Sequence, residues 1–218
     1  MSAALAAGLN YVFWTPKMGT VTATRKDALR RDRGSIVVSS GPTIGYFGGQ
    51  LRRGTDKILQ LLDTDYIDIL QLHAFDAFTP PEELLSTLDT LVDSGKVRHV
   101  GVSNYPGWQL MKALSCADRY GWPRFVAHQV YYSLVGRDYE ADLMPLAADQ
   151  GVGALVWSPL GWGRLTGKVR RGMPLPEGRR LHATAQFAPP VADDPLTQIH
   201  TALSPGAPAT GKTIPPTR

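Results

Sequence analysis

Short runs of apolar residues recur along the chain at nearly equal intervals. Four of them, at Tyr66–Leu72, Val97–Val102, Phe125–Val130 and Val152–Trp157, begin 31, 28 and 27 residues apart. The runs are almost wholly apolar rather than alternating, which is typical of strands that are covered on both faces. Strand, helix and strand at a spacing of about 30 residues form the βαβ unit, whose strands are parallel.

Helical patterns fill the segments between these strands, and each pattern ends at a glycine: Gly95, Gly121 or Gly151. Glycine adopts the left-handed conformation just past a helix without a steric penalty, so these residues indicate helix C-termini. The sequence Thr-Pro-Pro-Glu at Thr79–Glu82 predicts a capping box that opens one helix, with the prolines at positions that need no N–H donor.

Two further strands are predicted upstream, at Asn10–Trp14 and Ser35–Ser40, with helices at Thr22–Arg33 and Tyr46–Asp63. Six consecutive strands separated by helices predict an α/β fold. A closed (β/α)8 TIM barrel needs eight strands and about 250 residues, so we expect an incomplete barrel with about six of the eight βα units. An open doubly wound sheet is the alternative.

The pattern changes after Lys168. The last 50 residues hold 9 of the 17 prolines, and in this stretch only Leu196–Leu203 predicts a short helix. Dense proline and low apolar periodicity favour irregular structure. We therefore divide the chain into a partial barrel, residues 1–168, and a Pro/Ala/Gly-rich tail, residues 169–218, which is expected to be poorly ordered.

The composition is that of a globular protein, with 43% hydrophobic and 19% charged residues among 218, and this length favours one domain. The net charge of +4 comes from clusters without interleaved aromatic residues, so solvated helix faces explain it better than nucleic-acid binding. No apolar run approaches the roughly 20 residues that span a bilayer, and no signal-peptide pattern is present. A single cysteine, Cys116, excludes an intramolecular disulfide framework and fits a reducing compartment, so we expect a cytoplasmic protein.

The segment Gly206–Thr213, GAPATGKT, matches the phosphate-loop pattern GxxxxGK followed by Ser or Thr. That loop binds phosphate only between a strand and a helix whose N-terminal amides face the ligand. The flanking sequences TALSP and IPPTR favour neither element, so we do not expect ATP or GTP to bind here.

Polar and aromatic residues stand at the C-terminal ends of the last four apolar strands, the edge at which barrel active sites are built. The first two of these strands are followed by His73 and by Ser103 and Asn104, and the last two end near Gln129 and Trp157. Each residue has a structural alternative: His73 and Gln129 as buried polar groups with partners, Asn104 as a helix cap, and Trp157 as core. Taken together, the side chains at these four strand ends are of the kinds that could bind one flat amide group.

The next segment, Ser158–Gly167, is rich in glycine and is accompanied by Arg164 and Lys168. Backbone N–H groups together with two positive charges suit a pyrophosphate. A simple turn is the alternative interpretation.

Three stretches resemble the aldo-keto reductases, particularly the branch related to potassium-channel β subunits. They are LLDTDYIDILQLH at 61–73, GKVRHVGVSN at 95–104 and QVYYSLVGRDYEADLMPLAADQGVGALVWSPLGWGRLTGK at 129–168, and the resemblance extends over roughly residues 1–168. It implies a (β/α)8 barrel that binds NADPH, or alternatively NADH, without a Rossmann fold. It also implies hydride transfer between this cofactor and an aldehyde or ketone, in either direction.

The same resemblance implies the cofactor contacts. Ser103, Asn104 and Gln129 would hold the nicotinamide carboxamide, and Trp157 would stack on the ring. The pyrophosphate channel would be lined by Ser158, Pro159, Leu160, Gly161 and Lys168. No metal is expected.

The proton chemistry of the family uses a tyrosine, a lysine that lowers its pKa, an aspartate that orients the lysine, and a histidine. The histidine matches His73, which is the expected catalytic residue. Aligning GLNYVFWTPKMG places Phe13 at the aspartate and Met18 at the tyrosine, and Gly41 or a neighbour stands where the lysine belongs. A phenyl ring and a thioether donate no proton. Three of the four positions are therefore not matched.

Lys17 and Tyr46 lie near the unmatched positions and are alternative proton donors, but their spacing does not favour this role. The chain also begins inside what resembles the first helix of the family, and its tail lacks a pattern like the family's adenosine-phosphate site. Two explanations of these missing parts remain open: the chain is truncated, or it is a natural remnant of the barrel.

Three functions are compatible with these residues. The first is an NAD(P)H-dependent oxidoreductase that acts on a small carbonyl compound or alcohol, with impaired catalysis. The second is a non-catalytic barrel that binds the cofactor as a sensor or regulatory subunit. The third is a cofactor-independent lyase or isomerase with His73 as the base, in a pocket made apolar by Phe13 and Met18. Each of the three functions is compatible with a homo-oligomer.

Overall fold

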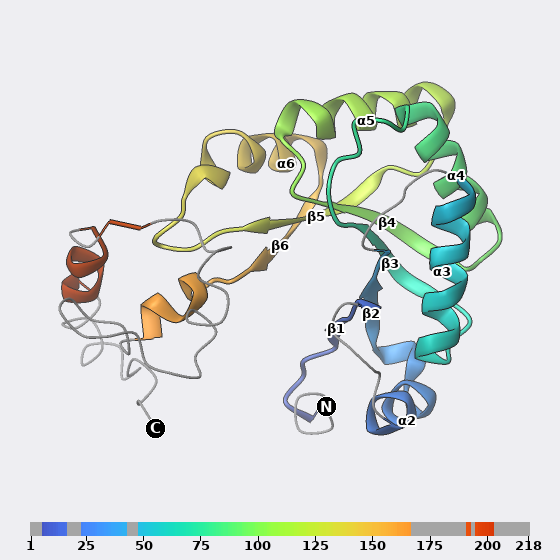
Figure 1. Ribbon diagram of the computed structural model, residues 1–218, viewed down its shortest axis with the longest axis horizontal. Coiled ribbons are helices and arrows are strands. Elements are labelled where there is room, and N and C mark those ends of the chain that lie inside the picture. Colours follow the sequence, from blue (N-terminus) through green and yellow to red (C-terminus); the bar gives the residue numbers. More distant parts are fainter. Residues whose placement is uncertain (1–5, 17–22, 43–47, 167–190, 193–194, 203–218) are drawn as a thin grey trace. The chain divides into compact units, whose positions relative to one another are not determined.

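The computed structural model describes residues 6–16, 23–42, 48–166, 191–192 and 195–202. Within these residues six strands form one sheet in sequential order, and each neighbouring pair from β1–β2 to β4–β5 is parallel (Figure 1). The strands are β1 (Tyr11–Phe13), β2 (Val37–Ser40), β3 (Ile67–Leu72), β4 (Val97–Ser103), β5 (Phe125–Tyr131) and β6 (Gly153–Trp157). The helices between them are α2 (Ala23–Arg31), α3 (Gly48–Leu62), α4 (Pro81–Asp93), α5 (Gly107–Tyr120) and α6 (Leu143–Gln150).

The strand order distinguishes the two architectures that the sequence left open. A doubly wound sheet reverses its order at a switch point, whereas β1 to β6 follow one another without a reversal. The fold is therefore an incomplete (β/α)8 TIM barrel, and the doubly wound alternative is wrong. All six predicted strands are confirmed, and their ends lie within two residues of the prediction.

The helix C-termini also follow the sequence. Gly95, Gly121 and Gly151 have φ angles of 75°, 70° and 68°, and Gly121 is the left-handed C-cap of α5. These are conformations that glycine adopts without the clash of a Cβ atom.

The predicted capping box at the start of α4 is wrong. Pro80 is the N-cap residue and makes no side-chain cap bond, so Thr79 lies one position too early to reach the first turn. The Thr79 hydroxyl donates instead to Oδ2 of Asp76 at 2.7 Å. Proline at N1 and glutamates in the first turn remain as the features that favour a helix start here.

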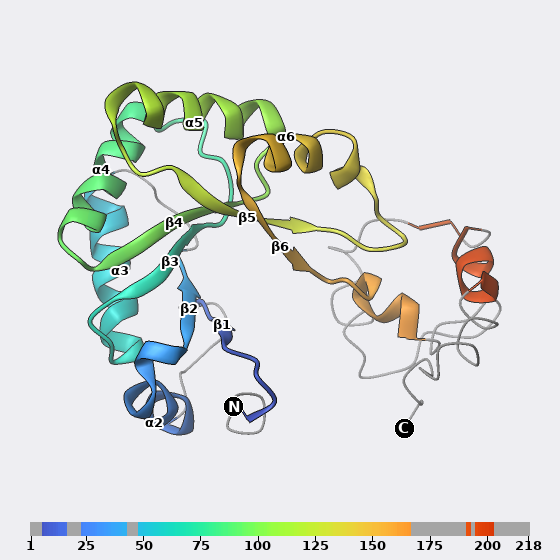
Figure 2. The same cartoon turned by 180° about the vertical axis from the view of Figure 1, so that it is seen from behind.

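The main core lies between the sheet and helices α3, α4 and α5, which follow one face of strands β2 to β4 (Figures 1 and 2). Because side chains alternate along a strand, Leu70 and Leu72 share one face of β3 while Gln71 lies on the other. Side chains of the core with no exposed surface include Leu70, Leu72, Leu85, Leu88, Val100, Val102, Leu110 and Leu114.

A charged cluster, here called the Asp68 cluster, ties the N-terminal ends of β2, β3 and β4 together. The Asp68 carboxylate accepts hydrogen bonds from the backbone N–H of Val38 at 2.8 Å and from Arg98 at 3.2 Å, and it pairs with Arg33 at 2.7 Å. The guanidinium carbons of Arg33 and Arg98 lie 3.8 and 3.9 Å from the centroid of the Tyr66 ring, within the range of cation–π attraction.

The chain divides into two compact units, which we describe separately. The first unit holds the residues up to Gln129 together with Leu146–Ala154, and the second holds Val130–Pro145 and the residues from Leu155 onward. In the second unit, residues 195–202 are helical, which confirms the short helix predicted at Leu196–Leu203. Most of the predicted tail, including GAPATGKT, lies outside the described residues, and the domain boundary at residue 168 stays a prediction.

Among the helices of the described residues, none is both long enough and apolar enough to cross a membrane.

Candidate functional site

His73 directly follows β3, as the sequence predicted. Its Nδ1 atom lies 3.0 Å from the backbone carbonyl oxygen of Pro42. A carbonyl oxygen only accepts, so Nδ1 carries a proton and donates it to Pro42. The ring of Phe13 meets the imidazole edge to face, with the centroids 6.1 Å apart. His73 is thus held in one orientation by a backbone carbonyl and an apolar ring.

Asn104 connects the ends of β3, β4 and β5. Its side-chain Nδ2 donates to the backbone carbonyl of His73 at 3.0 Å, and its backbone N–H donates to the carbonyl of Gln129 at 3.0 Å. The N-cap of α5 is Pro106, with no side-chain cap bond. The helix-cap interpretation of Asn104 is therefore wrong.

Ser103 and Gln129 belong to a hydrogen-bond chain that runs across three strands on one face of the sheet. The Ser103 hydroxyl donates to Oε1 of Gln129 at 3.4 Å and accepts from Nε2 of Gln71 at 3.3 Å. Gln71 also donates to the backbone carbonyl of Val102. Gln71 was not among the predicted site residues, although the alternation along β3 places it on the same face as His73, which follows two residues later.

These bonds fix which edge of each amide remains available. Oε1 of Gln129 is occupied by Ser103, which leaves its Nε2, a donor. Nδ2 of Asn104 is occupied by His73, which leaves its Oδ1, an acceptor. Among the described residues, neither remaining atom has a hydrogen-bond partner. The first unit thus offers one donor and one acceptor from adjacent strand ends.

Two of the unmatched catalytic positions lie in the described part of the first unit. Phe13 ends β1 and contacts His73. At Gly41, a Cβ atom would overlap the backbone carbonyl oxygen of Gln71, so no lysine fits there unless the backbone moves. Met18, Lys17 and Tyr46 lie outside the described residues.

In the second unit, Trp157 belongs to a cluster of three aromatic rings. Its centroid lies 5.2 Å from that of Tyr131, at an interplanar angle of 35°, and 5.2 Å from that of Trp162, at 84°. The rings of Tyr131 and Trp162 are 5.1 Å apart. Trp157 is therefore packed against two neighbours and is not a freely rotating surface ring.

The turn after β6 contains two buried polar atoms without a hydrogen-bond partner in the described chain, the hydroxyl of Ser158 and Nη1 of Arg164. The turn itself is closed by the N–H of Gly161, which donates to the carbonyl of Ser158 at 2.8 Å. Pro159 and Leu160 lie within this turn and are exposed. Lys168 lies outside the described residues.

Backbone strain concentrates at these strand ends. The described non-glycine residues with positive φ are Asp63, Asn104, Ser158 and Trp162, with φ angles of 56°, 56°, 51° and 58°. Asn104 directly follows β4, and Ser158 and Trp162 follow β6. Such conformations cost of order 1–3 kcal/mol each and cluster at functional sites.

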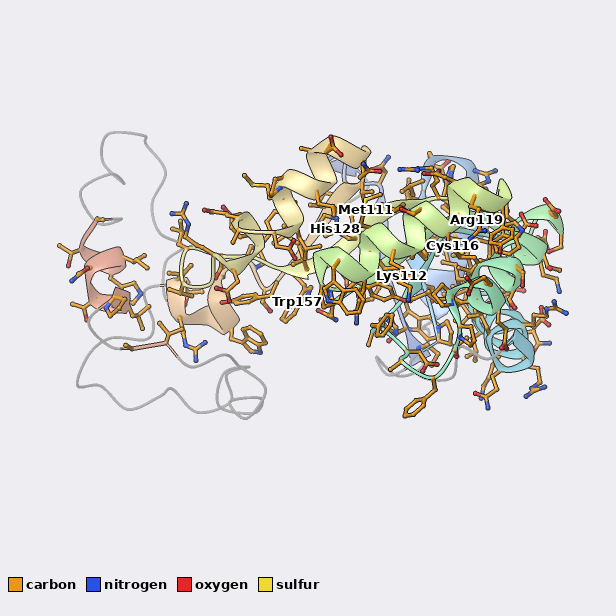
Figure 3. All side chains as sticks on the ribbon, turned by 90° about the horizontal axis from the view of Figure 1, so that it is seen from above. Met111, Lys112, Cys116, Arg119, His128 and Trp157 are labelled. Carbon is orange, nitrogen blue, oxygen red and sulfur yellow. The ribbon has the colours of Figure 1, made fainter. Side chains whose placement is uncertain are left out.

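Two other chemically notable residues lie away from these strand ends and are labelled in Figure 3. His128 in β5 is 2% exposed, and burial lowers the pKa of its imidazole. It stands next to Gln129 and so points to the opposite face of the sheet. Cys116 lies on α5 as a half-buried free thiol, and burial is the main cause that raises its pKa.

Within the described residues, no group of three or more His, Cys, Asp or Glu side chains is arranged to hold a metal ion.

The chain matches the model of a known family. A family model described as Aldo/keto reductase family matches residues 45–202, which is more than half of the chain. The protein therefore belongs to the aldo/keto reductase family.

Individual relatives are similar over part of their length. An uncharacterized oxidoreductase of Bacillus subtilis, YrpG, is 40% identical over 120 residues, which make up 55% of this chain and 37% of the relative. Norsolorinic acid reductase of Aspergillus flavus is 37% identical over 152 residues, with 63% of this chain and 39% of the relative covered. The chain thus spans less than half the length of either relative.

Among solved structures, the glycerol dehydrogenase AKR11B4 of Gluconobacter oxydans has a TM-score of 0.79 at 22% sequence identity. The similarity covers 98% of this chain and 68% of that chain. It shows that the two proteins share a fold.

Proposed function

We propose that this protein is an oxidoreductase that binds NADPH, or alternatively NADH, and transfers hydride between the cofactor and a small aldehyde, ketone or alcohol. The observation that carries the proposal is the pair of amide edges that Gln129 and Asn104 present at adjacent strand ends. The relatives named as an oxidoreductase and a reductase support the same class of reaction.

The amide edges fit the carboxamide of nicotinamide. A primary carboxamide has one carbonyl acceptor and one NH₂ donor group. Nε2 of Gln129 would donate to the carbonyl, and Oδ1 of Asn104 would accept from the NH₂ group. Ser103 would act beside them by holding Gln129 in place. When bound, the nicotinamide ring supplies or accepts the hydride.

The turn after β6, described by itself, has groups that suit phosphate. A buried hydroxyl and a buried guanidinium nitrogen without partners are unfavourable by about 1–3 kcal/mol each, and anionic oxygens would satisfy both Ser158 and Arg164. Leu160, Pro159, Gly161 and Lys168 would complete the pyrophosphate channel. Trp157 would stack on the nicotinamide ring.

A second candidate function, a cofactor-binding protein without reductase activity, is favoured by the residues near His73. Nδ1 of His73 donates its proton to the carbonyl oxygen of Pro42, so this proton is not available to a substrate carbonyl. Phe13 supplies no proton, and Gly41 has no room for a lysine side chain. This second candidate predicts cofactor binding without measurable turnover in either direction.

The proposal is tested by binding and turnover on the full chain. NADPH should quench tryptophan fluorescence, and Trp157→Phe should remove most of this quenching. Trp122→Phe is the matched control, because Trp122 stacks on Tyr120 in the first unit, away from the strand ends. No quenching of the wild-type chain at millimolar NADPH or NADH would exclude the proposal.

Turnover separates the two candidate functions. A panel of aldehydes, ketones and the corresponding alcohols is followed by the absorbance of the reduced cofactor. Turnover above the buffer rate identifies an oxidoreductase. Quenching without turnover identifies a cofactor-binding protein.

We also propose a cytoplasmic location, on the basis of the single cysteine.

A further inference from the structure

Gln71 is fully buried in β3 and has no part in the cofactor contacts proposed above. The neighbouring strand is shaped around it. A Cβ atom at Gly101 of β4 would lie 2.5 Å from Oε1 of Gln71 and 3.1 Å from the backbone oxygen of Ala127. Only glycine at this position of β4 leaves the room that the Gln71 amide occupies.

The direction of the Gln71 amide is fixed by a backbone carbonyl. The oxygen of Val102 only accepts hydrogen bonds, so the group that faces it must be the NH₂ of Gln71. Oε1 of Gln71 is buried and has no partner in the described chain. Turning the amide over would place this oxygen against the Val102 oxygen, which is less favourable than leaving it unpaired.

This direction is passed on to Ser103. Nε2 of Gln71 faces the Ser103 hydroxyl at 3.3 Å, so Ser103 accepts there and its proton points elsewhere. The proton is donated to Oε1 of Gln129 at 3.4 Å. Both distances exceed the usual 2.7–3.2 Å for N–H···O and 2.5–3.0 Å for O–H···O, so each bond is weak and its direction depends on the whole chain.

We infer that Gln71 is a positioning residue that makes Gln129 present an N–H donor to the ligand. It does so by fixing the direction of the Ser103–Gln129 hydrogen bond, and it touches no ligand itself. Without the Gln71 donor, the Ser103 hydroxyl is free to reverse, and Gln129 can turn its oxygen toward the ligand instead. A ligand carbonyl then meets an acceptor. The inference rests on the proposed function, in which that carbonyl belongs to nicotinamide.

A double-mutant cycle tests this role. Isothermal titration calorimetry gives the Kd for NADPH of the wild-type chain, Gln71→Met, Ser103→Ala and the double variant. Methionine has a similar length and no hydrogen-bond donor. Gln71→Met should raise the Kd about three- to tenfold, the value of one neutral hydrogen bond. In the Ser103→Ala background the same change should be less than about twofold, because residues that act in one network are not additive.

A cofactor analogue identifies the edge that is affected. The 3-acetylpyridine analogue of NADPH keeps the carbonyl and lacks the NH₂ group. Because Gln129 is assigned to the carbonyl, Gln71→Met should weaken NADPH and the analogue by the same factor. Weakening of NADPH alone would place the effect at the NH₂ contact and overturn the inference.

The control for lost stability is Thr87→Val. Thr87 in α4 is also buried, and its hydroxyl donates to the carbonyl of Glu83 at 2.9 Å. This variant should lower the melting temperature and leave the Kd unchanged. If Gln71→Met does not fold, Gln71→Leu replaces it in the cycle, since leucine also removes both N–H donors of the amide.

The outcomes separate the two claims. A wild-type chain that does not bind NADPH overturns the proposed function. Normal wild-type binding with a Gln71→Met change below twofold overturns only the role of Gln71, and so does an equal effect of Gln71→Met in both backgrounds. A threefold rise in Kd for Thr87→Val would show that stability alone explains the result, which also overturns it.

Discussion

Replacing Asp68 by asparagine removes the negative charge at the centre of the Asp68 cluster and keeps the size of the side chain. Asp68 is 7% exposed. Its carboxylate holds three donors from three different elements: the N–H of Val38, Arg33 and Arg98. Asparagine retains one oxygen for Val38 and loses the charge that attracts the two guanidinium groups.

The magnitude follows from the burial of each pair. The Arg33 side chain is 15% exposed, so its pair with Asp68 is largely removed from water, and breaking a buried pair costs about 3–5 kcal/mol. Arg98 is 53% exposed, so its pair contributes at most about 1 kcal/mol. Arg33 keeps other acceptors, including the carbonyls of Ile36 and Tyr66, so it is not left unpaired. We therefore expect a loss of about 2–3 kcal/mol, which is less than the full cost.

Urea unfolding at pH 7, followed by far-UV circular dichroism, measures this loss. A decrease in Tm of roughly 4–12 °C should accompany it, at about 2–4 °C per kcal/mol for a chain of this size. The matched control is Asp56→Asn, because the Asp56–Lys96 pair at 2.7 Å has side chains 46% and 44% exposed. That variant should lose less than about 1 kcal/mol. If Asp68→Asn costs no more than Asp56→Asn, the reasoning about the buried cluster is refuted.

Three further predictions concern single residues. Burial lowers the pKa of His128, so the unfolded chain takes up this proton first as pH falls. The stability that the neutral His128 ring allows is therefore lost progressively below about pH 6.5. In His128→Leu, the urea concentration at the unfolding midpoint should depend less on pH between pH 5 and 8 than in the wild type. Gly101→Ala should cost about 1–3 kcal/mol through the clash with Gln71, whereas Gly34→Ala, with nothing within 4 Å, should change stability by less than about 0.5 kcal/mol. Gly41→Lys should lower Tm without creating carbonyl reduction, because its Cβ overlaps the Gln71 carbonyl.

Each of these has a contradicting result. A pH profile of His128→Leu parallel to that of the wild type would mean that another group controls acid stability. Equal stability of Gly101→Ala and Gly34→Ala would show that β4 does not require a glycine at position 101. A stable Gly41→Lys variant with measurable reductase activity would show that the backbone near Gly41 adapts to a side chain.

Much of the fold could be predicted because it depends on patterns that are local in sequence. The apolar strands at intervals of about 30 residues and the glycines after the helices act through strand periodicity and backbone sterics, and both were confirmed. The capping box failed for a local reason as well. Pro80 shifted the N-cap by one residue, and Asp76, which the motif does not include, competed for the Thr79 hydroxyl.

The candidate site was less predictable, because its contacts join residues about 30 positions apart. The sequence indicated His73, Ser103 and Asn104 as residues at strand ends, but it did not show that Asn104 donates to the carbonyl of His73. The alternation along β3 would have placed Gln71 on the face of His73, but it did not show that Gly101 leaves room for the Gln71 amide. The roles of all these residues toward a cofactor stay predictions.

The left-handed backbone of Asn104 limits which substitutions there are informative. With φ at 56°, this position accepts glycine readily and asparagine or aspartate moderately well, whereas alanine or leucine adds a steric penalty of roughly 1–2 kcal/mol. An alanine scan would therefore mix the loss of the amide with a distortion of the loop after β4. Asn104→Gly keeps the local conformation and removes only the side chain, so it isolates what that amide contributes.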